Sequence, residues 1–414
     1  MIRNIKGTKD ILPNETDLWQ YVENHIHDFL KKFGYSEIRT PMFEETNLFS
    51  RSIGSETDIV SKEMYSWIDQ GGNNLTLKPE STASVVRAFN QHNFANLNKI
   101  NRFYYINSLF RRERPQKGRY RQFEQFGVEA IGSDSPEQDI EIISMAYFFY
   151  EHMKLSNLKL KVNSIGSLET RKNYKKSLQD FLMDYEKELT DVSKKRLKVN
   201  PLRILDTKID FEINIIKNAP KIIDYLEDPD KKHFETILNS LEKINIKYEI
   251  DHRLVRGLDY YSRTVFEIHS DLLGSQAALC GGGRYDYLIK ELSGPSTPAI
   301  GFAAGIERLI IAMDKEEHNF SINPDIYIIT LGQEAIDYSL NIMKELRLND
   351  NLSVVSDTLK RNLKSQMKEA NKLNVSHVII IGDNEIKNKK LIVKNMETGT
   401  QEEISINKIS QYFK

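Results

Sequence analysis

The strongest chemical signal in the chain is an arginine-rich hairpin, FRRERPQKGRYRQFEQFGVE, over residues 110–129. Between Phe110 and Gln122 it has six Lys/Arg residues and one acid, Glu113. Guanidinium groups match the oxygen geometry of phosphates, and an aromatic ring such as Phe123 can stack on a base. The alternative is a solvated basic hairpin tip. The combination of residue types favours a nucleotide site.

Two predicted strands, residues 102–110 and 120–132, must position these side chains. Side chains alternate along a strand, so residues of one parity share a face. In the second strand this face holds Arg121, Phe123, Gln125 and Glu129. The same alternation places Arg111 and Glu113 together where the first strand meets the loop. The hairpin therefore predicts a polar, cationic face with one aromatic ring.

Two further segments, GIERLI (305–310) and CGGGRYD (280–286), also suggest ligand contact. In GIERLI, Arg308 lies near the start of a predicted helix, where a cation opposes the positive helix end unless an anion is close. The alternative is an exposed arginine. In CGGGRYD, residues 280–286, three glycines either lie flat against a ligand or form a flexible turn.

The segment LVRGLDYYSRT, residues 254–264, combines Arg256 with Tyr260 and Tyr261 in a predicted strand that spans 253–270. Tyrosines on a strand commonly pack in the core or at an edge. An arginine beside them is harder to explain as packing, because an unpaired buried charge is very costly. Arg256 therefore predicts a bound anion.

Bulk composition narrows the classes of function. A chain of 414 residues predicts two or three domains, and 40% hydrophobic with 28% charged residues is typical of a soluble globular protein. The net charge of -1 requires local basic patches for any nucleic-acid contact. The single cysteine, Cys280, excludes an internal disulfide framework, and the histidine spacing indicates no protein metal site. The absence of a signal peptide or long apolar run favours a cytoplasmic protein without membrane contact.

Periodicity predicts an α+β first half, with an antiparallel sheet and flanking helices. Helices are expected over residues 15–33 and 137–153, and a strand-to-helix transition over 75–92 with Ser81 or Thr82 as cap. From about 169 to 247 the sequence is Lys/Glu-rich and helical, which indicates an insertion. Strand patterns return at 253–270 and 276–288, followed by a helix ending near 314.

The last 90 or so residues have a different pattern, with strands and helices in strict alternation. Strands are predicted at 326–331, 353–355 and 377–381, and helices at 334–346 and 358–373. This pattern is typical of a small α/β domain. No Walker A motif and no Rossmann glycine motif is present, which disfavours those nucleotide-binding classes.

Taken together, these motifs resemble the class II aminoacyl-tRNA synthetases, and within them the histidyl-tRNA synthetases, over essentially the whole chain. GYSEIRTP with Pro41 resembles the family's first motif, at the dimer interface. The arginine hairpin resembles the second motif and GIERL the third. LVRGLDYY and GGGRYD resemble the family's two histidine-specific segments, and GTKDILP its opening segment.

The resemblance implies a class II antiparallel sheet flanked by helices, with a helical insertion and a C-terminal α/β domain. The catalytic domain would comprise residues 1–168 and 248–318, interrupted by the insertion at 169–247. Residues 325–414 would form the anticodon-binding domain. The relatives differ from this chain at Arg112, where many have histidine, and at Ser81, where glycine is common.

Residue roles also follow from the resemblance. Arg111 and Arg256 would be catalytic, with Arg256 contacting the reacting carboxylate and the α-phosphate where other class II enzymes use a metal. The ATP site would consist of Arg111, Glu113, Arg119, Phe123 and Arg308. The histidine site would consist of Glu80, Ser81, Thr82, Arg111, Gln125, Glu129, Arg256, Tyr260 and Tyr261.

The implied reaction is ATP-dependent attachment of L-histidine to tRNA(His) through a histidyl-adenylate, with Mg2+ accompanying the ATP phosphates and a homodimer as the working unit. Gln116 or Arg114 in the hairpin loop would read the tRNA acceptor end. Two alternatives remain: a non-catalytic relative such as the regulatory subunit of ATP phosphoribosyltransferase, and a histidine- or RNA-sensing module. The intact LVRGLDYY and GGGRYD segments and the extra α/β domain count against the first.

Overall fold

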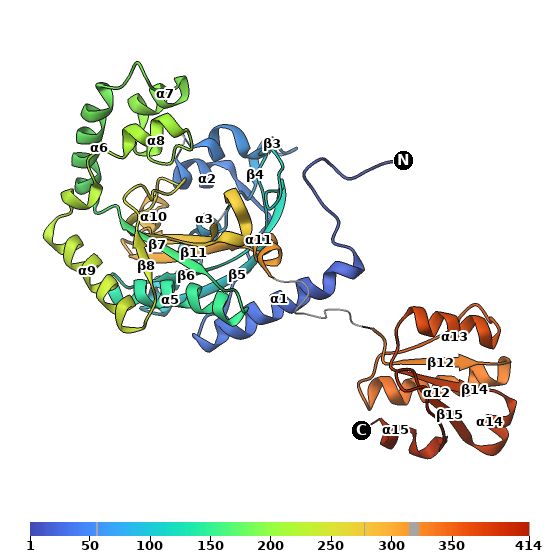
Figure 1. Cartoon of the computed structure of the whole chain (residues 1–414). Helices are drawn as coiled ribbons and strands as arrows, with labels where there is room; N and C mark the ends of the chain where they lie inside the picture. Colours follow the sequence, from blue (N-terminus) through green and yellow to red (C-terminus); the bar gives the residue numbers. More distant parts are fainter. Residues whose placement is uncertain (55–56, 277, 314–322, 414) are drawn as a thin grey trace. The chain divides into compact units, whose positions relative to one another are not determined.

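The structure is a computed structural model that describes residues 1–54, 57–276, 278–313 and 323–413 (Figure 1). The chain divides into two compact units, Met1–Asn319 and Phe320–Lys414. Each unit has its own sheet, as the change of sequence pattern near residue 320 predicts. Within the described residues, no helix has the length and apolar character needed to cross a membrane.

The first unit is built on an eight-stranded sheet in the order β1-β5-β6-β11-β10-β9-β7-β8. β1 with β5 and β7 with β8 pair in parallel, whereas the other neighbours are antiparallel. The strands are β1 (Ser36–Glu37), β5 (Asn101–Phe110), β6 (Gln122–Ile131), β7 (Leu158–Ser164), β8 (Tyr248–Ile250), β9 (Ser262–Ser270), β10 (Ala278–Arg284) and β11 (Ala299–Gly305). This confirms the predicted α+β class.

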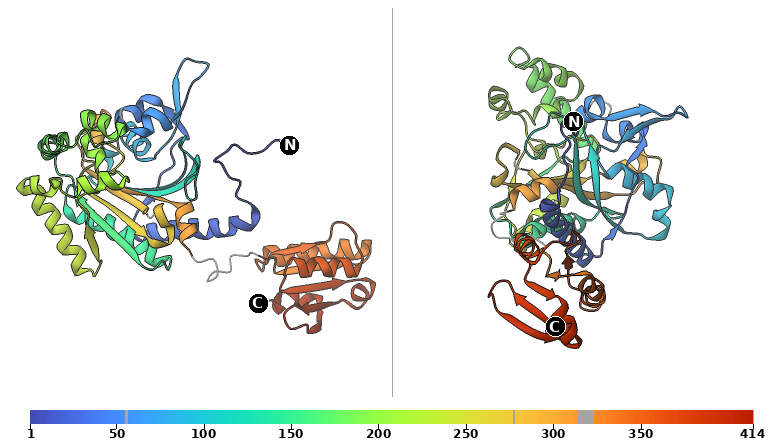
Figure 2. Two further views of the ribbon diagram at one scale, coloured as in Figure 1. Left: turned by 45° about the horizontal axis from the view of Figure 1, so that its top comes forward. Right: turned by 90° about the vertical axis from the view of Figure 1, so that its right-hand side faces the viewer.

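Two long helices cover one face of this sheet, α1 (Pro13–Lys32) and α5 (Pro136–His152), as Figures 1 and 2 show. Both begin with proline in the first turn, where the missing N–H costs no helical bond. The apolar side chains on one side of α1 are buried: Leu18, Val22, Ile26, Phe29 and Leu30 are at most 8% exposed. This burial leaves the opposite face of the central strands for the site.

A smaller three-stranded sheet, in the order β2-β4-β3, stands beside the main one. It packs with short helices and leads into α3. These elements are β2 (Phe43–Glu45), α2 (Thr46–Ile53), the π-helix η1 (Ile59–Glu63), β3 (Tyr65–Ile68), β4 (Asn74–Leu77), α3 (Thr82–Gln91) and α4 (Phe94–Leu97).

Ser81 is the N-cap residue of α3, one of the two predicted, but its side chain makes no capping bond. Neither Ser81 nor Thr82 caps the helix with its side chain. The carboxylate of Glu80 accepts the N–H groups of Thr82 and Ala83 instead, at 2.7 and 2.8 Å. The two hydroxyls have other partners, because Ser81 accepts from Asn107 and Thr82 donates to Glu129. A carboxylate at a helix N-terminus is favourable both as acceptor and as charge.

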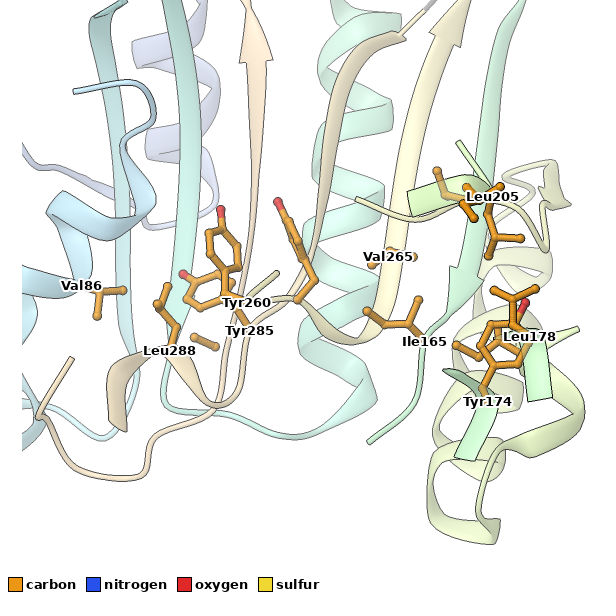
Figure 3. Packing of buried hydrophobic residues seen from close by; sticks show 14 of the residues in the cluster. Val86, Ile165, Tyr174, Leu178, Leu205, Tyr260, Val265, Tyr285 and Leu288 are labelled. Atoms are coloured by element: carbon orange, nitrogen blue, oxygen red, sulfur yellow. The ribbon is translucent and has the colours of Figure 1, made fainter. Parts of the chain in front are cut away.

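The stretch between β7 and β8 corresponds to the predicted insertion, and it consists of helices and helical turns. They are α6 (Leu168–Met183), α7 (Asp191–Val199), η2 (Pro201–Ile204), α8 (Asp210–Ile216), η3 (Ile222–Tyr225) and α9 (Asp228–Lys243). One hydrophobic cluster extends from Val86 and Tyr285 through Ile165 to Leu178 and Leu205 (Figure 3). The insertion therefore shares a continuous core with the sheet.

The strand predicted for residues 253–270 begins only at Ser262. Arg256, Tyr260 and Tyr261 lie in the irregular segment before it, so their predicted position on a strand is wrong. The three glycines of GGGRYD lie inside β10, which excludes the turn alternative. The remaining elements are η4 (Asp271–Gln276), α10 (Leu288–Glu291) and α11 (Ile306–Ala312).

The second unit is a five-stranded sheet in the order β13-β12-β14-β15-β16, with hydrophobic clusters on both faces. The predicted alternation of strand and helix continues through α14 to β15 and ends there, because β15 and β16 form an antiparallel hairpin. The elements are β12 (Ile326–Thr330), α12 (Gln333–Leu348), β13 (Val354–Ser356), α13 (Leu363–Lys372), β14 (His377–Ile381), α14 (Asp383–Asn388), β15 (Lys390–Asn395), β16 (Gln401–Ser405), η5 (Ile406–Lys408) and α15 (Ile409–Tyr412).

Candidate active site

One cavity of about 250 Å³ in the first unit contains every residue that the sequence nominated for the site. Its lining includes Glu80, Ser81, Thr82, Arg111, Glu113, Arg119, Phe123, Gln125, Glu129, Arg256, Tyr260, Tyr261 and Arg308. They come from the start of α3, the β5–β6 hairpin, the LVRGLDYY segment and α11. The fold thus gathers at one place residues that are far apart in the sequence.

The end of the hairpin supplies a cationic and aromatic corner. Arg111 donates from Nε to the Pro79 carbonyl at 2.9 Å, and its guanidinium carbon lies 5.5 Å from the centre of the Phe123 ring. Arg119 pairs with Glu113 at 3.1 Å. β5 and β6 keep strict antiparallel register up to Phe110 and Gln122, so the predicted alternation of side chains is preserved. Arg121 was predicted to share the face of Phe123, but it lies just before β6 and does not line the cavity; its Nε donates to the Glu113 carbonyl.

Arg308 reaches the same corner from the start of α11. It donates from Nε to the Gly118 carbonyl at 3.2 Å and from Nη1 to the Ala278 carbonyl at 2.8 Å. Burial lowers the pKa of Arg308 below its ordinary value, and the neighbouring charge of Arg119 lowers it further. A bound anion would relieve this repulsion, so the corner is suited to phosphate rather than to another cation.

Glu129 is the centre of a buried polar cluster at the other end of the cavity. One of its oxygens accepts from Thr82 Oγ1 at 2.7 Å and from the Tyr105 hydroxyl at 3.4 Å. The other accepts from the Tyr285 hydroxyl at 2.5 Å. Burial raises the pKa of Glu129 to about 8 despite these donors. Its carboxyl group therefore keeps a proton to a higher pH than a glutamate in solution does.

Glu80 is the second buried carboxyl of this end, 4% exposed. Burial raises the pKa of Glu80, whereas the hydrogen bonds that its carboxylate accepts from two backbone N–H groups of α3 lower this pKa. Glu80 therefore has two functions in the fold, as a helix cap and as part of the cavity wall. Tyr260 and Tyr261, with rings 4.7 Å apart, complete this polar aromatic end.

Arg256 lies in this cavity with Glu267 as its ion-pair partner. Burial pulls the pKa of Arg256 down, but Glu267 and then Tyr261 hold it above its ordinary value. Its guanidinium carbon is 5.7 Å from the centre of the Tyr261 ring. Its Nε is buried without a hydrogen-bond partner among the described residues. A buried donor without a partner is costly, so the position of Arg256 depends on its ion pair with Glu267.

The sequence analysis missed several residues of the cavity, among them Tyr105, Tyr285 and Glu267. Tyr105 has the same parity as Arg111 along β5, so the alternation argument would have found it if applied to the whole strand. Tyr285 follows Arg284 directly, but no sequence feature distinguishes which of the two faces the cavity. Arg284 is fully buried elsewhere and pairs with Asp139 at 2.5 Å.

Comparison with known proteins gives the family. The sequence model described as "Histidyl-tRNA synthetase" matches residues 7–309, and that described as "Anticodon binding domain" matches residues 325–414. A histidine–tRNA ligase of Staphylococcus haemolyticus is 44% identical, over 100% of this chain and 99% of the relative. One of Thermosipho melanesiensis is 47% identical, over 98% and 96% respectively.

A solved structure agrees with the sequence relatives. The apo histidyl-tRNA synthetase of S. aureus superposes with a TM-score of 0.85 at 38% identity, and the match covers 100% of both chains. The family model extends over both parts of the large sheet and through the insertion between them. The chain belongs to the histidyl-tRNA synthetase family.

Proposed function

We propose that the cavity performs adenylate formation and supports the transfer of histidine to tRNA(His). Family membership gives the overall activity: the chain is an aminoacyl-tRNA synthetase that charges tRNA with histidine, with histidine, ATP and tRNA as substrates. The observation that supports the site is the gathering of the hairpin, the LVRGLDYY segment and the α11 arginine around one cavity.

In the first step the histidine carboxylate attacks the α-phosphorus of ATP and pyrophosphate leaves. Arg111 would hold the α-phosphate, and Arg119 with Arg308 the outer phosphates. Phe123 would stack on adenine, with Glu113 accepting from its amino group. No protein nucleophile is needed, so the rate comes from positioning and from stabilising developing charge. We infer that Mg2+ accompanies the ATP phosphates.

Arg256 would contact both the reacting carboxylate and the α-phosphate. Its charge is fixed by Glu267, and its side chain lines the cavity. A cation held in place before the reaction needs little reorganisation as charge develops. In the second step the ribose hydroxyl of the tRNA end attacks the adenylate carbonyl, and Gln116 or Arg114 in the hairpin loop would read the acceptor end.

Histidine selectivity would come from the buried carboxyl groups and tyrosines. Glu129 and Glu80, with Tyr260, Tyr261, Thr82 and Gln125, would bond the imidazole and the amino group. A site whose buried polar groups need the substrate as partner rejects analogues that lack it by about 10^4-fold or more. Glu129 is 1% exposed, and its donors from Thr82, Tyr105 and Tyr285 leave part of the hydrogen-bonding capacity of its two oxygens for the imidazole.

We also propose a homodimer formed through the segment around Pro41. The large side chains next to it, Met42, Phe43 and Trp67, are 39%, 49% and 39% exposed, and such clustered apolar exposure is common at protein interfaces. The division into a catalytic domain (1–168 and 248–318), an insertion (169–247) and an anticodon-binding domain (325–414) is likewise a proposal, as is a cytoplasmic location.

The alternatives predict ligand binding without turnover. A Bacillus halodurans protein described as an ATP phosphoribosyltransferase regulatory subunit/histidyl-tRNA synthetase shares the fold, with a TM-score of 0.67, at only 21% identity. Histidine-dependent exchange of pyrophosphate into ATP separates the enzyme from both alternatives. We expect exchange with histidine and none without it; binding of histidine without exchange would contradict the proposal. Charging of tRNA(His) with and without its extra 5′ guanosine then tests acceptor-end reading.

A further inference from the structure

The LVRGLDYY segment (residues 254–261) has no helix or strand of its own between β8 and β9. Nevertheless it places Arg256, Tyr260 and Tyr261 in the catalytic cavity. An irregular segment lacks the repeated backbone bonds that hold a strand in place, so other contacts must fix it. Several of these contacts come from a distant part of the chain.

Asp259, in the middle of the segment, is held by the helical insertion. Both of its carboxylate oxygens accept from Nη2 of Arg203, each at 3.1 Å. Asn200 Nδ2 donates to the same carboxylate at 3.4 Å. Arg203 belongs to η2, and Asn200 is the residue directly before that turn. The backbone N–H of Asp259 donates to the Ile53 carbonyl, so the residue is fixed from two sides.

A second arginine of the insertion holds the backbone of the same segment. Arg171, on α6, donates from Nη1 to the carbonyls of Tyr261 at 2.8 Å and Asp259 at 3.3 Å. Burial lowers the pKa of Arg171 below its ordinary value. A buried cation directed at two carbonyls is costly unless those bonds form, so the contact depends on the position of the segment.

The segment is also a wall between two cavities. The second cavity, of about 560 Å³, lies between α6, η2 and the segment, and Arg171, Arg203 and Asp259 line it. Arg256 and Tyr261 line both this cavity and the catalytic one. A displacement of the insertion would therefore move the wall that holds the catalytic arginine.

We propose that Arg203 and Arg171 are positioning residues, which act through Asp259 and the backbone of the LVRGLDYY segment to hold Arg256 and Tyr261 in the histidine site. The helical insertion is thereby coupled to amino-acid binding: its position and the occupancy of the histidine site favour one another. This inference rests on the proposed function and adds a structural origin for the geometry of the site.

If the Arg203–Asp259 pair only stabilised the fold, its loss would lower the free energy of unfolding and would not act selectively on histidine binding. The side chains of Arg203 and Asp259 are 17% and 40% exposed, and partly exposed ion pairs contribute little to global stability. The pair nevertheless restricts the segment, because Nη2 of Arg203 donates to both carboxylate oxygens of Asp259 while the Asp259 N–H donates to the Ile53 carbonyl. Loss of the pair should therefore affect the affinity for histidine much more than it affects unfolding or the affinity for ATP.

The test uses Arg203→Ala, Asp259→Asn and the double variant in histidine-dependent ATP–pyrophosphate exchange with the full chain. We expect KM for histidine to rise roughly tenfold in each single variant, with KM for ATP within about twofold of wild type. The double variant should be no worse than either single one, because both remove the same contact. Lys172→Ala is the matched control: its side chain lines the second cavity but pairs with Glu169 at 3.9 Å, and both KM values should stay at wild type.

If the wild type catalyses exchange, two results would overturn the inference. The first is an unchanged KM for histidine in each single variant. The second is an equal rise in KM for histidine and KM for ATP, with additive effects in the double variant. Absence of exchange in the wild type would instead contradict the proposed function itself. If Arg203→Ala does not fold, Asp259→Asn keeps the size of the side chain and removes only its charge, and a selective rise in KM for histidine is still expected.

Discussion

The guanidinium group of Arg256 lies directly over Gly281. A Cβ placed on Gly281 would come within 2.5 Å of both terminal nitrogens of Arg256. The contact joins the LVRGLDYY segment to the glycine triplet of β10, and it explains why a residue without a side chain is needed inside a strand at this point. The nearest atoms are the end of a flexible side chain, so the added methyl group would move the guanidinium rather than the backbone.

Gly281→Ala should therefore reduce activity without unfolding the protein. We expect the exchange rate to fall about tenfold or more, since a displacement of a catalytic group by about 1 Å can cost about a hundredfold. The melting temperature should change little. The control is Gly257→Ala, because a methyl group placed there meets no atom of the described residues within 4 Å beyond its own chain neighbours. Similar rates for both variants would show that the Arg256–Gly281 contact is unimportant.

Arg256→Ala should reduce adenylate formation by at least about a hundredfold, because removal of one fixed donor to developing charge costs roughly 2.7 to 4 kcal/mol. Thermal unfolding checks that the fold is intact, and pyrophosphate exchange measures the step. Arg253→Ala is a suitable control, because Arg253 lies near the segment and contacts Asp251 at 3.9 Å. Exchange near the wild-type rate in Arg256→Ala would remove Arg256 from the mechanism.

Glu129→Ala should raise KM for histidine far more than KM for ATP. The substitution removes the acceptor of Thr82 and Tyr285 and leaves buried hydroxyls without a partner. Steady-state exchange at varied histidine and varied ATP gives the two constants separately. Equal effects on both would indicate that Glu129 supports the fold of the cavity and does not read the substrate.

Glu129 should also produce a pH-dependent stability. Burial raises its pKa from 4.5 to about 8, so between these values the folded chain holds a proton that the unfolded chain has lost. Stability from this group is therefore complete below about pH 4 and declines as the pH rises towards 8. In Glu129→Gln this decline should disappear, a difference on the order of 2–3 kcal/mol between pH 6 and pH 8. The same change of urea midpoint between pH 6 and pH 8 in the wild type and in Glu129→Gln would contradict the assignment.

Arg284 is predicted to be structural although it belongs to GGGRYD. It is 0% exposed and bonds Asp139, Asp286 and the carbonyls of Ser133 and Ser135. Arg284→Ala leaves a buried carboxylate uncompensated and should cost roughly 3–5 kcal/mol of unfolding free energy. Denaturant titration measures this loss. A stable variant with a selectively raised KM for histidine would instead place Arg284 in substrate binding.

The hairpin was predictable because its alternation of side chains survives in the folded sheet. Phe123, Gln125 and Glu129 share parity in the sequence, and all three line the cavity. The side-chain hydrogen bonds at the cap of α3 were not predictable, because the hydroxyl groups of Ser81 and Thr82 bond Asn107 and Glu129 instead. Tertiary contacts decide such competitions, and local propensity does not include them.

Tertiary contacts also explain two other differences between the predicted and the observed elements. The LVRGLDYY segment has the composition of a strand, yet Arg171 and Arg203 from the distant insertion hold it in an irregular path. In the second unit, β15 and β16 add an antiparallel edge that the alternating pattern before it gave no reason to expect. Strand alternation and residue type pointed to most of the site residues, and the family resemblance added Glu80, Arg119 and the role of each residue.

The pairing of β6 with β11 has a consequence for how the protein is made. Their register joins Gln125 to Gly305 and Ile131 to Ala299, so one edge of the arginine hairpin stays open until the ribosome has synthesised the insertion and the glycine triplet. An open strand edge invites pairing with other chains, and contacts so distant in sequence slow folding. Nascent chains that stop before residue 299 should therefore depend heavily on chaperones, and an enzyme essential to translation would be most vulnerable during its own translation.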